Sequence, residues 1–374
     1  MWMQRSWNGF GRTLVNPTGI RKLGTSSRPR VLLLDEIQLA TNELEKLKES
    51  ADVLHNETTS RKEFLRAISP GGPYDGIRGL YRHFGGAKSI QITGRFDQEL
   101  VDALPSSLNF LVHNGAGYDQ LDIPALSARD IQTANVPTVV NEASADTALF
   151  LLIGAMRRFA LAMNELHTGK FNSQFPFRTA SDPESKVLGI VGAGGIGQAL
   201  AKKAAHALGM RILYHNRNRL PDAKETAGMP SGERMQYCHT LDELLESSDA
   251  VSLHCPITPE TRHLMSDAQF SKMKQSAVLI NTARGPVVDE AAMVHALDAG
   301  TIAGVGLDVY ENEPKLHPGL LELAKSKALL LPHVATLSLE TQTAMEATCL
   351  NNLMHGLASG KLAYTVREQE KIQF

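Results

Sequence analysis

Glycines at residues 192 to 197 have the spacing of a loop that binds the phosphates of a dinucleotide. Gly192, Gly194 and Gly197 form the pattern G-x-G-x-x-G between the apolar run Val187–Val191 and the helix-forming run Gln198–Leu208. A strand before the glycines and a helix after them make the pattern specific, because the helix N-terminus then faces the pyrophosphate. The residues predicted to contact the pyrophosphate are Gly192, Gly194, Gly195, Ile196 and Gly197.

The end of the next expected strand indicates which nicotinamide nucleotide is preferred. In NAD-binding chains an acid about 20 residues after the last glycine holds the ribose 2′-hydroxyl. Here the residue 19 positions after Gly197 is Asn216, and Arg217 and Arg219 follow it. The missing carboxylate removes repulsion of a 2′-phosphate, and an arginine offers that phosphate charge-assisted hydrogen bonds. We expect NADP(H), with Asn216 and Arg217 at the ribose, and keep NAD(H) as the alternative.

Four further segments combine a glycine turn or an ionisable residue with the end of an expected strand. They are Asn114-Gly-Ala-Gly-Tyr-Asp119, Ile280-Asn-Thr-Ala-Arg284-Gly-Pro, Gly306-Leu-Asp308-Val-Tyr-Glu311-Asn-Glu313-Pro and Leu331-Pro-His333. With these motifs in this order, residues 31 to 365 resemble the D-isomer-specific 2-hydroxyacid dehydrogenase family, most closely its fungal glyoxylate and hydroxypyruvate reductases. The resemblance implies hydride transfer between NAD(P)H and C2 of a small 2-oxo acid or D-2-hydroxy acid.

Arg284, Glu313 and His333 are the predicted catalytic residues. Reduction of a 2-oxo acid needs one group that binds the carboxylate and polarises the carbonyl, and another that protonates the developing alkoxide. Arg284 suits the first task, because a guanidinium presents a planar fork of donors. His333 suits the second, because imidazole titrates near neutral pH and works in both directions. Glu313 is expected to pair with His333 and to favour its protonated form.

The small residues at 115–117 are expected to bind the substrate carboxylate. Such a loop exposes backbone N–H groups, and a nest of these groups binds anions. The resemblance gives Ala116 and Gly117 this role, together with Arg284. The segment 94–96 and Tyr118 are placed against the substrate side chain from their loop positions alone.

Three more residues are assigned to the cofactor by resemblance. Asp308 resembles the family residue near the nicotinamide carboxamide, and Thr282 and Pro256 resemble residues that line the cofactor groove. No cluster of His, Asp and Glu has the spacing of a metal site, so we expect no metal.

Alternating apolar strands and amphipathic helices predict an α/β protein. We expect two doubly wound parallel-sheet domains, a flavodoxin-like substrate domain and a Rossmann cofactor domain, with a cleft between them. The first domain should contain strands at Val31–Asp35, Ser89–Thr93 and Phe110–His113 and a helix at Thr41–Ser50. The second should contain strands near Lys186–Val191, Met210–His215, Ala250–Cys255, Ala277–Asn281, Gly304–Val309 and Ala328–Leu331.

The chain is expected to cross between the two domains twice. A long helix from Asn141 to about Lys170 should bridge them, and a helix from Ser338 to about Leu357 should return to the first. The predicted limits are 1–30 for a basic leader, 31–137 and 338–374 for the substrate domain, and 138–337 for the Rossmann domain.

Charge and composition exclude several classes of partner. Residues 1–30 hold six basic side chains and no acid, which is typical of a mitochondrial transit peptide or of a disordered leader. The remainder has 32 basic and 40 acidic side chains, a net charge of −8 that disfavours nucleic-acid binding. No apolar run is long enough to span a membrane, and three widely spaced cysteines indicate no disulfide framework. A cytoplasmic location is expected, with mitochondria as the alternative.

Two other functions on the same fold stay open at this point. One is an NAD-dependent dehydrogenase of the D-mandelate type, which cofactor preference and substrate size would distinguish. The other is a nucleotide-sensing transcriptional corepressor, which would bind peptides instead of reducing an acid. Formate dehydrogenation is disfavoured because Glu313 would then be a neutral residue. The resemblance also implies a homodimer formed through the helix from Asn141 to Gly169 and the second domain.

Overall fold

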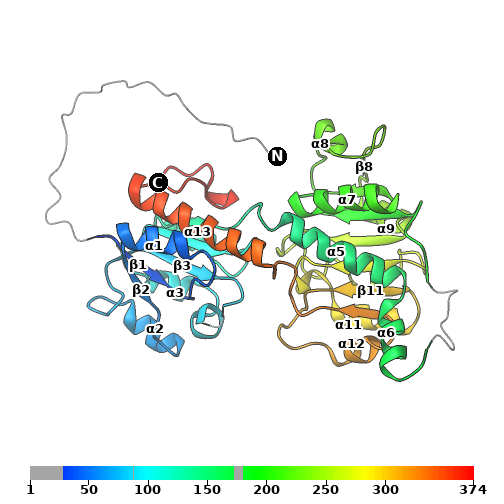
Figure 1. The fold of residues 1–374 in the computed structure, drawn as a ribbon, viewed down its shortest axis with the longest axis horizontal. Coiled ribbons are helices and arrows are strands. Elements are labelled where there is room, and N and C mark those ends of the chain that lie inside the picture. Colours follow the sequence, from blue (N-terminus) through cyan, green and yellow to red (C-terminus); the bar gives the residue numbers. More distant parts are fainter. Residues whose placement is uncertain (1–27, 87, 172–179) are drawn as a thin grey trace.

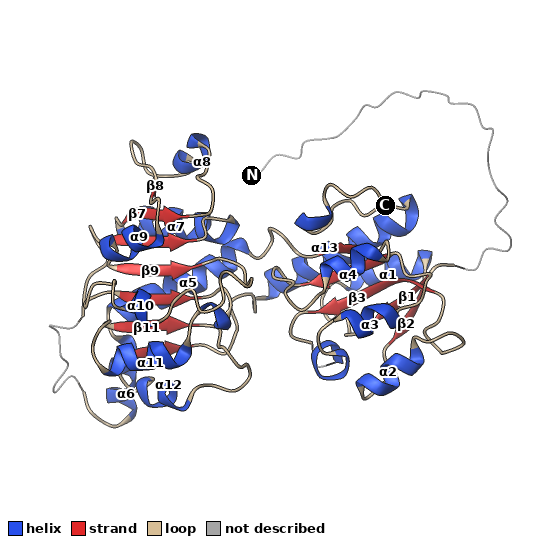
Figure 2. Ribbon diagram, turned by 180° about the vertical axis from the view of Figure 1, so that it is seen from behind, coloured by secondary structure: helices blue, strands red, loops and turns tan. Residues whose placement is uncertain are grey.

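The computed structural model describes residues 28–86, 88–171 and 180–374, which form two lobes (Figure 1). Each lobe contains a parallel β-sheet with helices on both faces (Figure 2). The predicted α/β class with two parallel-sheet domains is therefore confirmed. Residues 1–27 of the predicted leader lie outside the described part. Within the described residues, no helix is both long and apolar enough to cross a membrane.

The sheet of the first lobe has the flavodoxin-like strand order 2-1-3-4-5. Every side chain of its fourth strand is buried, because helices cover both faces of the sheet. In spatial order the described strands are β2 (Asp52–His55), β1 (Arg30–Leu33), β3 (Ile77–His83), β4 (Phe110–Asn114) and β5 (Gln132–Ala134). The connecting helices are α1 (Thr41–Ser50), α2 (Arg61–Ala67), α3 (Gln98–Ala103) and α4 (Ile123–Ala128).

One predicted strand of the first lobe is wrong. Residues Ser89–Thr93 lie in a π-helical turn, η1 (Lys88–Thr93), and β3 occupies the central place in the sheet. The Ser89 hydroxyl donates to the Asp35 carboxylate, and the Thr93 hydroxyl donates to the Ser89 carbonyl. These two hydrogen bonds, one to a residue 54 positions away and one within the turn, satisfy polar side chains that a fully buried strand would leave without partners, so the segment coils instead.

The sheet of the second lobe has the Rossmann order, extended by one strand at an edge. The two-residue strand β8 (Gln236–Tyr237), which was not predicted, is too short to show a periodic pattern in the sequence. In spatial order the described strands are β12 (Ala328–Leu330), β11 (Gly304–Leu307), β10 (Val278–Asn281), β9 (Ala250–Leu253), β6 (Val187–Val191), β7 (Arg211–His215) and β8 (Gln236–Tyr237). Their helices are α7 (Gly195–Leu208), α8 (Asp222–Thr226), α9 (Leu241–Ser247), α10 (Asp267–Phe270), η3 (Gly285–Val287), α11 (Glu290–Asp298) and α12 (Pro318–Leu323).

The prediction of a single helix from Asn141 to about Lys170 is wrong, because the helix is interrupted. It consists of α5 (Asn141–Met156) and α6 (Phe159–His167). Between them Arg158 adopts the left-handed conformation with φ of +60°, and its guanidinium donates to the Ala303 carbonyl at 2.5 Å. That buried bond fixes the break. Helix α5 packs against α7, β10 and β11, so it belongs to the second lobe (Figure 1).

The last long helix, α13 (Leu339–Ser359), returns to the first lobe and packs against β3, β4 and α1. Its Glu346 carboxylate accepts the N–H groups of Gln38, Leu39 and Ala40, which anchors the helix to the loop after β1. A short turn, η4 (Arg367–Gln369), follows it. The chain therefore crosses between lobes before α5 and before α13. The domain limits at residues 137 and 338 remain predictions.

Candidate active site

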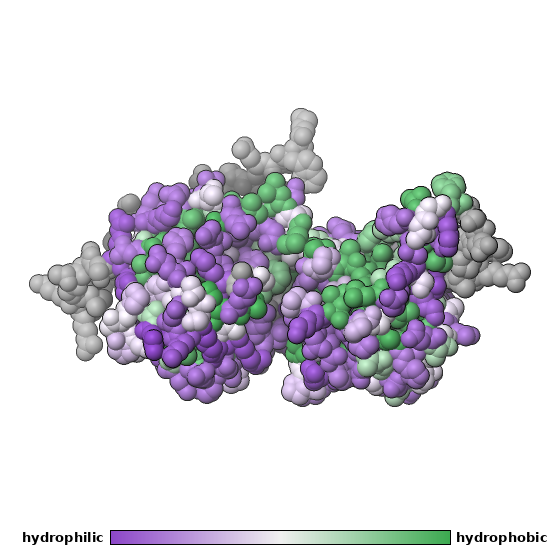
Figure 3. Space-filling model, turned by 90° about the horizontal axis from the view of Figure 1, so that it is seen from below, coloured by the Kyte–Doolittle hydropathy of each residue, from purple (hydrophilic) through white to green (hydrophobic). Residues whose placement is uncertain are grey.

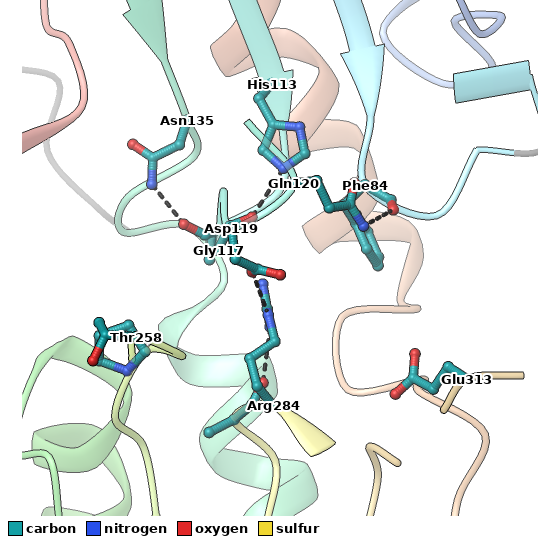
Figure 4. Close-up of polar contacts among 12 residues, drawn as sticks. Phe84, His113, Gly117, Asp119, Gln120, Asn135, Thr258, Arg284 and Glu313 are labelled. Carbon is teal, nitrogen blue, oxygen red and sulfur yellow. Dashed lines mark hydrogen bonds and ion pairs between the residues drawn. The ribbon is translucent and has the colours of Figure 1, made fainter. Parts of the chain in front are cut away.

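In the turn that follows β4, the backbone carbonyl groups accept hydrogen bonds from other residues of the first lobe. Among the described residues, the N–H groups of Ala116 and Gly117 donate no hydrogen bond. The carbonyls of Gly115, Ala116 and Gly117 bond to the Val136 N–H, the Asn135 amide and the His113 ring, at 2.9, 2.7 and 2.9 Å (Figure 4). The hydrogen bonds to the carbonyls hold the turn in place, and its two N–H groups have no partner among the described residues. Neighbouring free N–H groups of this kind can bind a carboxylate.

Arg284 follows β10 in the second lobe and reaches this turn of the first lobe. Its Nε atom donates to Asp119 Oδ1 at 2.8 Å, and its Nη1 atom donates to the Ala283 carbonyl at 2.8 Å (Figure 4). A Cβ atom on Gly117 would lie 1.7 Å from Arg284 Nη2, so only glycine permits this approach. The two predicted carboxylate-binding elements therefore meet between the lobes, where Figure 3 shows a notch.

His333 and Glu313 form a hydrogen-bonded pair at the same end of the second sheet. His333 Nδ1 lies 2.8 Å from Glu313 Oε2, and the Tyr310 N–H donates to Glu313 Oε1 at 2.9 Å. Burial alone would raise the pKa of Glu313, but the His333 hydrogen bond and charge, with the Tyr310 N–H, lower it overall. Glu313 is therefore ionised at neutral pH. Because Nδ1 of His333 faces Glu313, its Nε2 is the atom available to a substrate.

The predicted cofactor residue Asp308 holds the backbone that carries His333. Both oxygens of its wholly buried carboxylate accept hydrogen bonds, from the Val334 N–H at 2.8 Å and the Ala335 N–H at 2.9 Å. Burial raises the pKa of Asp308, although both N–H groups and the nearby His333 oppose that change. His333 itself has a φ of +57°, which is uncommon for a residue with a side chain. Asp308 fixes the turn that follows this conformation.

The glycine fingerprint forms the turn between β6 and α7. Gly192 has a φ of +96°, a value that favours glycine, and Gly194 precedes the first helical turn without any side-chain cap. Gly195, Ile196 and Gly197 lie in that first turn, so their N–H groups have no partner inside the helix. A Cβ atom on Gly194 would contact nothing within 4 Å among the described residues. The helix end is thus open to an anion.

Asn216 and Arg219 bond within the protein, whereas Arg217 is exposed. Asn216 Oδ1 accepts the Ala193 N–H at 2.8 Å, so it holds the glycine turn against the end of β7. Arg219 donates to both oxygens of the buried Glu225, at 2.8 and 2.9 Å, and with Arg234 it lines a pocket of about 340 Å³. Arg219 is thus already paired with a carboxylate, whereas Arg217 is exposed and follows the end of β7. Contact of either arginine with a 2′-phosphate remains a prediction.

Thr282 and Pro256 follow β10 and β9 at the same edge of the sheet. Thr282 is buried, and its hydroxyl has no hydrogen-bond partner among the described residues. Pro256 is exposed, and its carbonyl accepts the Thr261 hydroxyl at 2.7 Å. A buried hydroxyl without a partner is unusual, and the open N-terminus of α7 follows β6 at the same edge of the sheet. The described residues therefore fit a nicotinamide dinucleotide.

Sequence and structure comparisons agree on one family. Residues 149–335 match the NAD-binding domain of the D-isomer-specific 2-hydroxyacid dehydrogenases. The 4-methyl-2-oxopentanoate reductase A of Aspergillus oryzae is 41% identical over 345 residues, which cover 92% of this chain and 99% of that relative. The chain belongs to the D-isomer-specific 2-hydroxyacid dehydrogenase family.

Two crystal structures resemble this dehydrogenase over nearly their whole length. A glyoxylate reductase from Paecilomyes thermophila is 40% identical, with a TM-score of 0.84 over 92% of this chain and 100% of the other. The holo form of Rhodotorula graminis D-mandelate dehydrogenase is 29% identical, with a TM-score of 0.83 over 91% and 98% of the two chains. Both lobes of the dehydrogenase are therefore included in the similarity.

The described residues of this dehydrogenase include groups suited to anion binding and groups suited to proton transfer. Arg284 lies against the turn at Ala116 and Gly117, whose N–H groups donate no hydrogen bond among the described residues, and the His333–Glu313 pair follows other strands of the sheet that carries Arg284. The first set can hold a carboxylate, and the second can give a proton to an adjacent oxygen. The site roles of Arg284, Glu313, His333, Ala116 and Gly117 remain predictions.

The expectation for the segment 94–96 fails at Phe96, which is wholly buried in the core of the first lobe. Tyr118 donates its hydroxyl to Glu368 Oε2 at 2.9 Å. Two residues near the predicted catalytic groups were not assigned a role from the sequence. Phe84 has its ring centroid 5.6 Å from that of His333, and Asp119 accepts the hydrogen bond of Arg284. The motif that ends in Asp119 was recognised, but nothing in it indicates that its partner is an arginine 165 positions later.

Proposed function

We propose that this dehydrogenase works mainly as an NADPH-preferring reductase that converts small 2-oxo acids into D-2-hydroxy acids. The observation that carries the proposal is the meeting of Arg284 with the turn at Ala116 and Gly117. An arginine fork resting on an anion nest suits the carboxylate of a 2-oxo acid, and it lies within the same cleft as the His333–Glu313 pair.

In this proposal each residue has one task. The N–H groups of Ala116 and Gly117 bind the substrate carboxylate, and Arg284 binds the carboxylate and polarises the C2 carbonyl. The bound nicotinamide supplies the hydride to C2. His333 Nε2 gives its proton to the C2 oxygen, and the ionised Glu313 stabilises the positive charge on His333 before that transfer. Oxidation of the hydroxy acid runs through the same groups in reverse.

The preference for NADPH rests on the end of β7. Asn216 brings no negative charge to the ribose, because it is neutral and its oxygen is bonded to the Ala193 N–H. Arg217 follows Asn216 directly and is exposed, so its charge is available to a 2′-phosphate at this end of β7.

The size of the substrate is set in this proposal by Phe84. Its ring lies against His333 from the first lobe, so a side chain on C2 must pass it. This favours glyoxylate and hydroxypyruvate. Two relatives are named for 4-methyl-2-oxopentanoate and D-mandelate, which are larger acids. The second candidate function is therefore NAD-dependent oxidation of a larger D-2-hydroxy acid.

Initial rates of NADPH and NADH oxidation test both choices at once. Each cofactor is measured with glyoxylate, hydroxypyruvate, 4-methyl-2-oxopentanoate and phenylglyoxylate. Faster NADPH oxidation with the two small acids is expected. Faster NADH oxidation with phenylglyoxylate would move the enzyme to the mandelate type, and no oxidation with any pair would support the corepressor alternative.

We also propose that two copies of this chain pair through α5 and α6. Within the described residues these helices expose Phe150, Phe159, Met163 and Leu166, by 50, 39, 51 and 61%. Figure 3 shows hydrophobic surface on the lobe that carries them. A second copy would cover such side chains, since groups of exposed apolar side chains mark interaction sites. Light scattering after chromatography should give twice the chain mass, and Met163→Glu with Leu166→Glu should give the monomer mass.

The location in the cell is proposed to be cytoplasmic, with mitochondria as the alternative. The acid-free composition of residues 1–30 is the argument for import. A fluorescent protein fused after residue 374 distinguishes the two, because a mitochondrial pattern that disappears on deletion of residues 1–30 would establish import.

A further inference from the structure

His113 lies directly beneath the turn that carries the substrate-binding N–H groups. It belongs to β4, is wholly buried, and places its Nε2 atom 2.9 Å from the Gly117 carbonyl oxygen. A carbonyl only accepts hydrogen bonds, so Nε2 carries the hydrogen and donates it. Figure 4 shows the ring pointing at the turn from inside the lobe. His113 is therefore the buried donor that holds Gly117.

Gly117 is the residue on which two parts of the site depend. Its N–H group donates no hydrogen bond among the described residues, and Arg284 Nη2 would lie 1.7 Å from a Cβ atom at this position. A rotation of the peptide at Gly117 would therefore move an anion donor and the surface under the guanidinium together. The bond from His113 to the carbonyl of this residue opposes that rotation.

The surroundings keep His113 in the neutral form. Burial lowers the pKa of His113 well below its usual range, and the charges of Arg82, Arg284 and His83 lower it further. The Gly117 carbonyl acts in the opposite direction but is outweighed. Arg82 is the register neighbour of His113 on β3 and is itself fully buried. A neutral ring with one hydrogen, on Nε2, has a single bond to donate, and it goes to Gly117.

The His113 ring fills the space beneath the turn. A Cβ atom on Gly115 would lie 2.8 Å from His113 Nε2 and 2.7 Å from Phe84 Cβ. The other carbonyls of the turn have their own partners, among them Asn135 for Ala116. Among the described residues, His113 is the side chain that donates to the Gly117 carbonyl.

We propose that His113 is a positioning residue for substrate binding: its Nε2–H fixes the Gly117 carbonyl, so that the Ala116 and Gly117 N–H groups and Arg284 face one carboxylate. The inference rests on the proposed function and adds a buried residue to the site. His113 contacts neither the substrate nor the cofactor, so its effect should appear in substrate affinity and not in cofactor affinity.

A matched pair of substitutions separates the hydrogen bond from the packing. His113→Gln retains an N–H donor at about the distance of Nε2, whereas His113→Met has a similar shape and no donor. We expect Met to raise the KM for glyoxylate and the inhibition constant of oxalate about tenfold, which corresponds to loss of one hydrogen bond. Gln should stay within about threefold of the wild type, and the KM for NADPH should be unchanged in both.

Thermal unfolding of both variants accompanies the kinetics. If the role is only to fill space, Gln and Met lower the unfolding temperature and kcat alike while the oxalate constant stays at the wild-type value, and the inference falls. If Met does not fold, His113→Asn replaces it, because its amide is too short to reach Gly117, and it should show the same selective loss. Absence of wild-type turnover with every 2-oxo acid would overturn the proposed function itself, whereas wild-type turnover with equal Gln and Met constants overturns only the role of His113.

Discussion

Arg284 of the second lobe donates its Nε hydrogen to Asp119 of the first lobe at 2.8 Å. With Nη1 on the Ala283 carbonyl and Nη2 against Gly117, this bond fixes the plane of the guanidinium before any substrate binds. Both partners are only about one-third exposed or less, so the pair is partly shielded from water. A fork that is held in position loses less entropy when a carboxylate arrives.

Because the guanidinium of Arg284 is held in one plane, we expect that a positive charge alone at position 284 does not support full activity. Arg284→Lys retains the positive charge but loses the planar donors that Asp119 and a carboxylate share. We expect kcat/KM for glyoxylate to fall about 100-fold, the size of effect found when one preorganised donor is lost. Asp119→Asn keeps an acceptor for Nε and should cost less than Asp119→Ala. Steady-state kinetics of the three variants test this expectation. Equal losses of kcat/KM in Asp119→Asn and Asp119→Ala would show that Asp119 does not position Arg284.

Gly117→Ala should damage the same site by a steric route. The added methyl group would overlap Arg284 Nη2 and displace the guanidinium, and a displacement of about 1 Å can reduce turnover about 100-fold. Gly71→Ala is the control, because no described atom lies within 4 Å of a Cβ there, although its φ of +79° adds backbone strain. Wild-type kcat/KM in Gly117→Ala would show that Arg284 does not rest on this residue during turnover.

Glu313→Gln should change the pH dependence of reduction. The lowered pKa of Glu313 means that its negative charge is present throughout the neutral range, where it favours protonated His333. Reduction needs that proton. The Glu313 charge is lost only when this carboxylate takes up a proton in the acidic range, so the wild type should lose kcat/KM there, and the Gln variant should show no such loss.

A pH–rate profile from pH 5 to pH 9 checks this expectation, with about tenfold lower activity expected at neutral pH. His333→Ala is the reference variant, since it should lose turnover at every pH while keeping NADPH affinity. A Glu313→Gln profile that overlies the wild-type profile would contradict a role for this carboxylate in protonating His333.

Arg217→Ala should weaken NADPH selectively. Removal of the exposed cation leaves a 2′-phosphate without its charge-assisted hydrogen bond, so the KM for NADPH should rise about tenfold or more. The KM for NADH should change less than twofold, because NADH carries no phosphate there. Arg219→Ala is the matched control: its guanidinium is bonded to Glu225, and we expect it to lower stability more than cofactor preference. Equal effects on both nucleotides would exclude Arg217 as the phosphate ligand.

The sequence alone determined the elements whose signals are local. The glycine fingerprint predicted the turn between β6 and α7. The apolar runs predicted most strands of the second lobe, because a buried parallel strand is apolar along its length. The same local reasoning failed at Ser89–Thr93 and at Arg158. There a hydroxyl–carboxylate bond and a contact with the Ala303 carbonyl, both made to distant parts of the chain, decided the backbone.

Only the tertiary structure decided which residues share the cleft. Asp119 and Arg284 are 165 positions apart, Phe84 and His333 come from different lobes, and His113 reaches its turn from a buried strand. No spacing along the chain encodes such contacts, because they depend on how two separately folded sheets present their carboxyl ends to each other. The motifs therefore identified the chemistry that the residues can perform, and the packing of the two lobes decided which of them meet and which are bonded elsewhere.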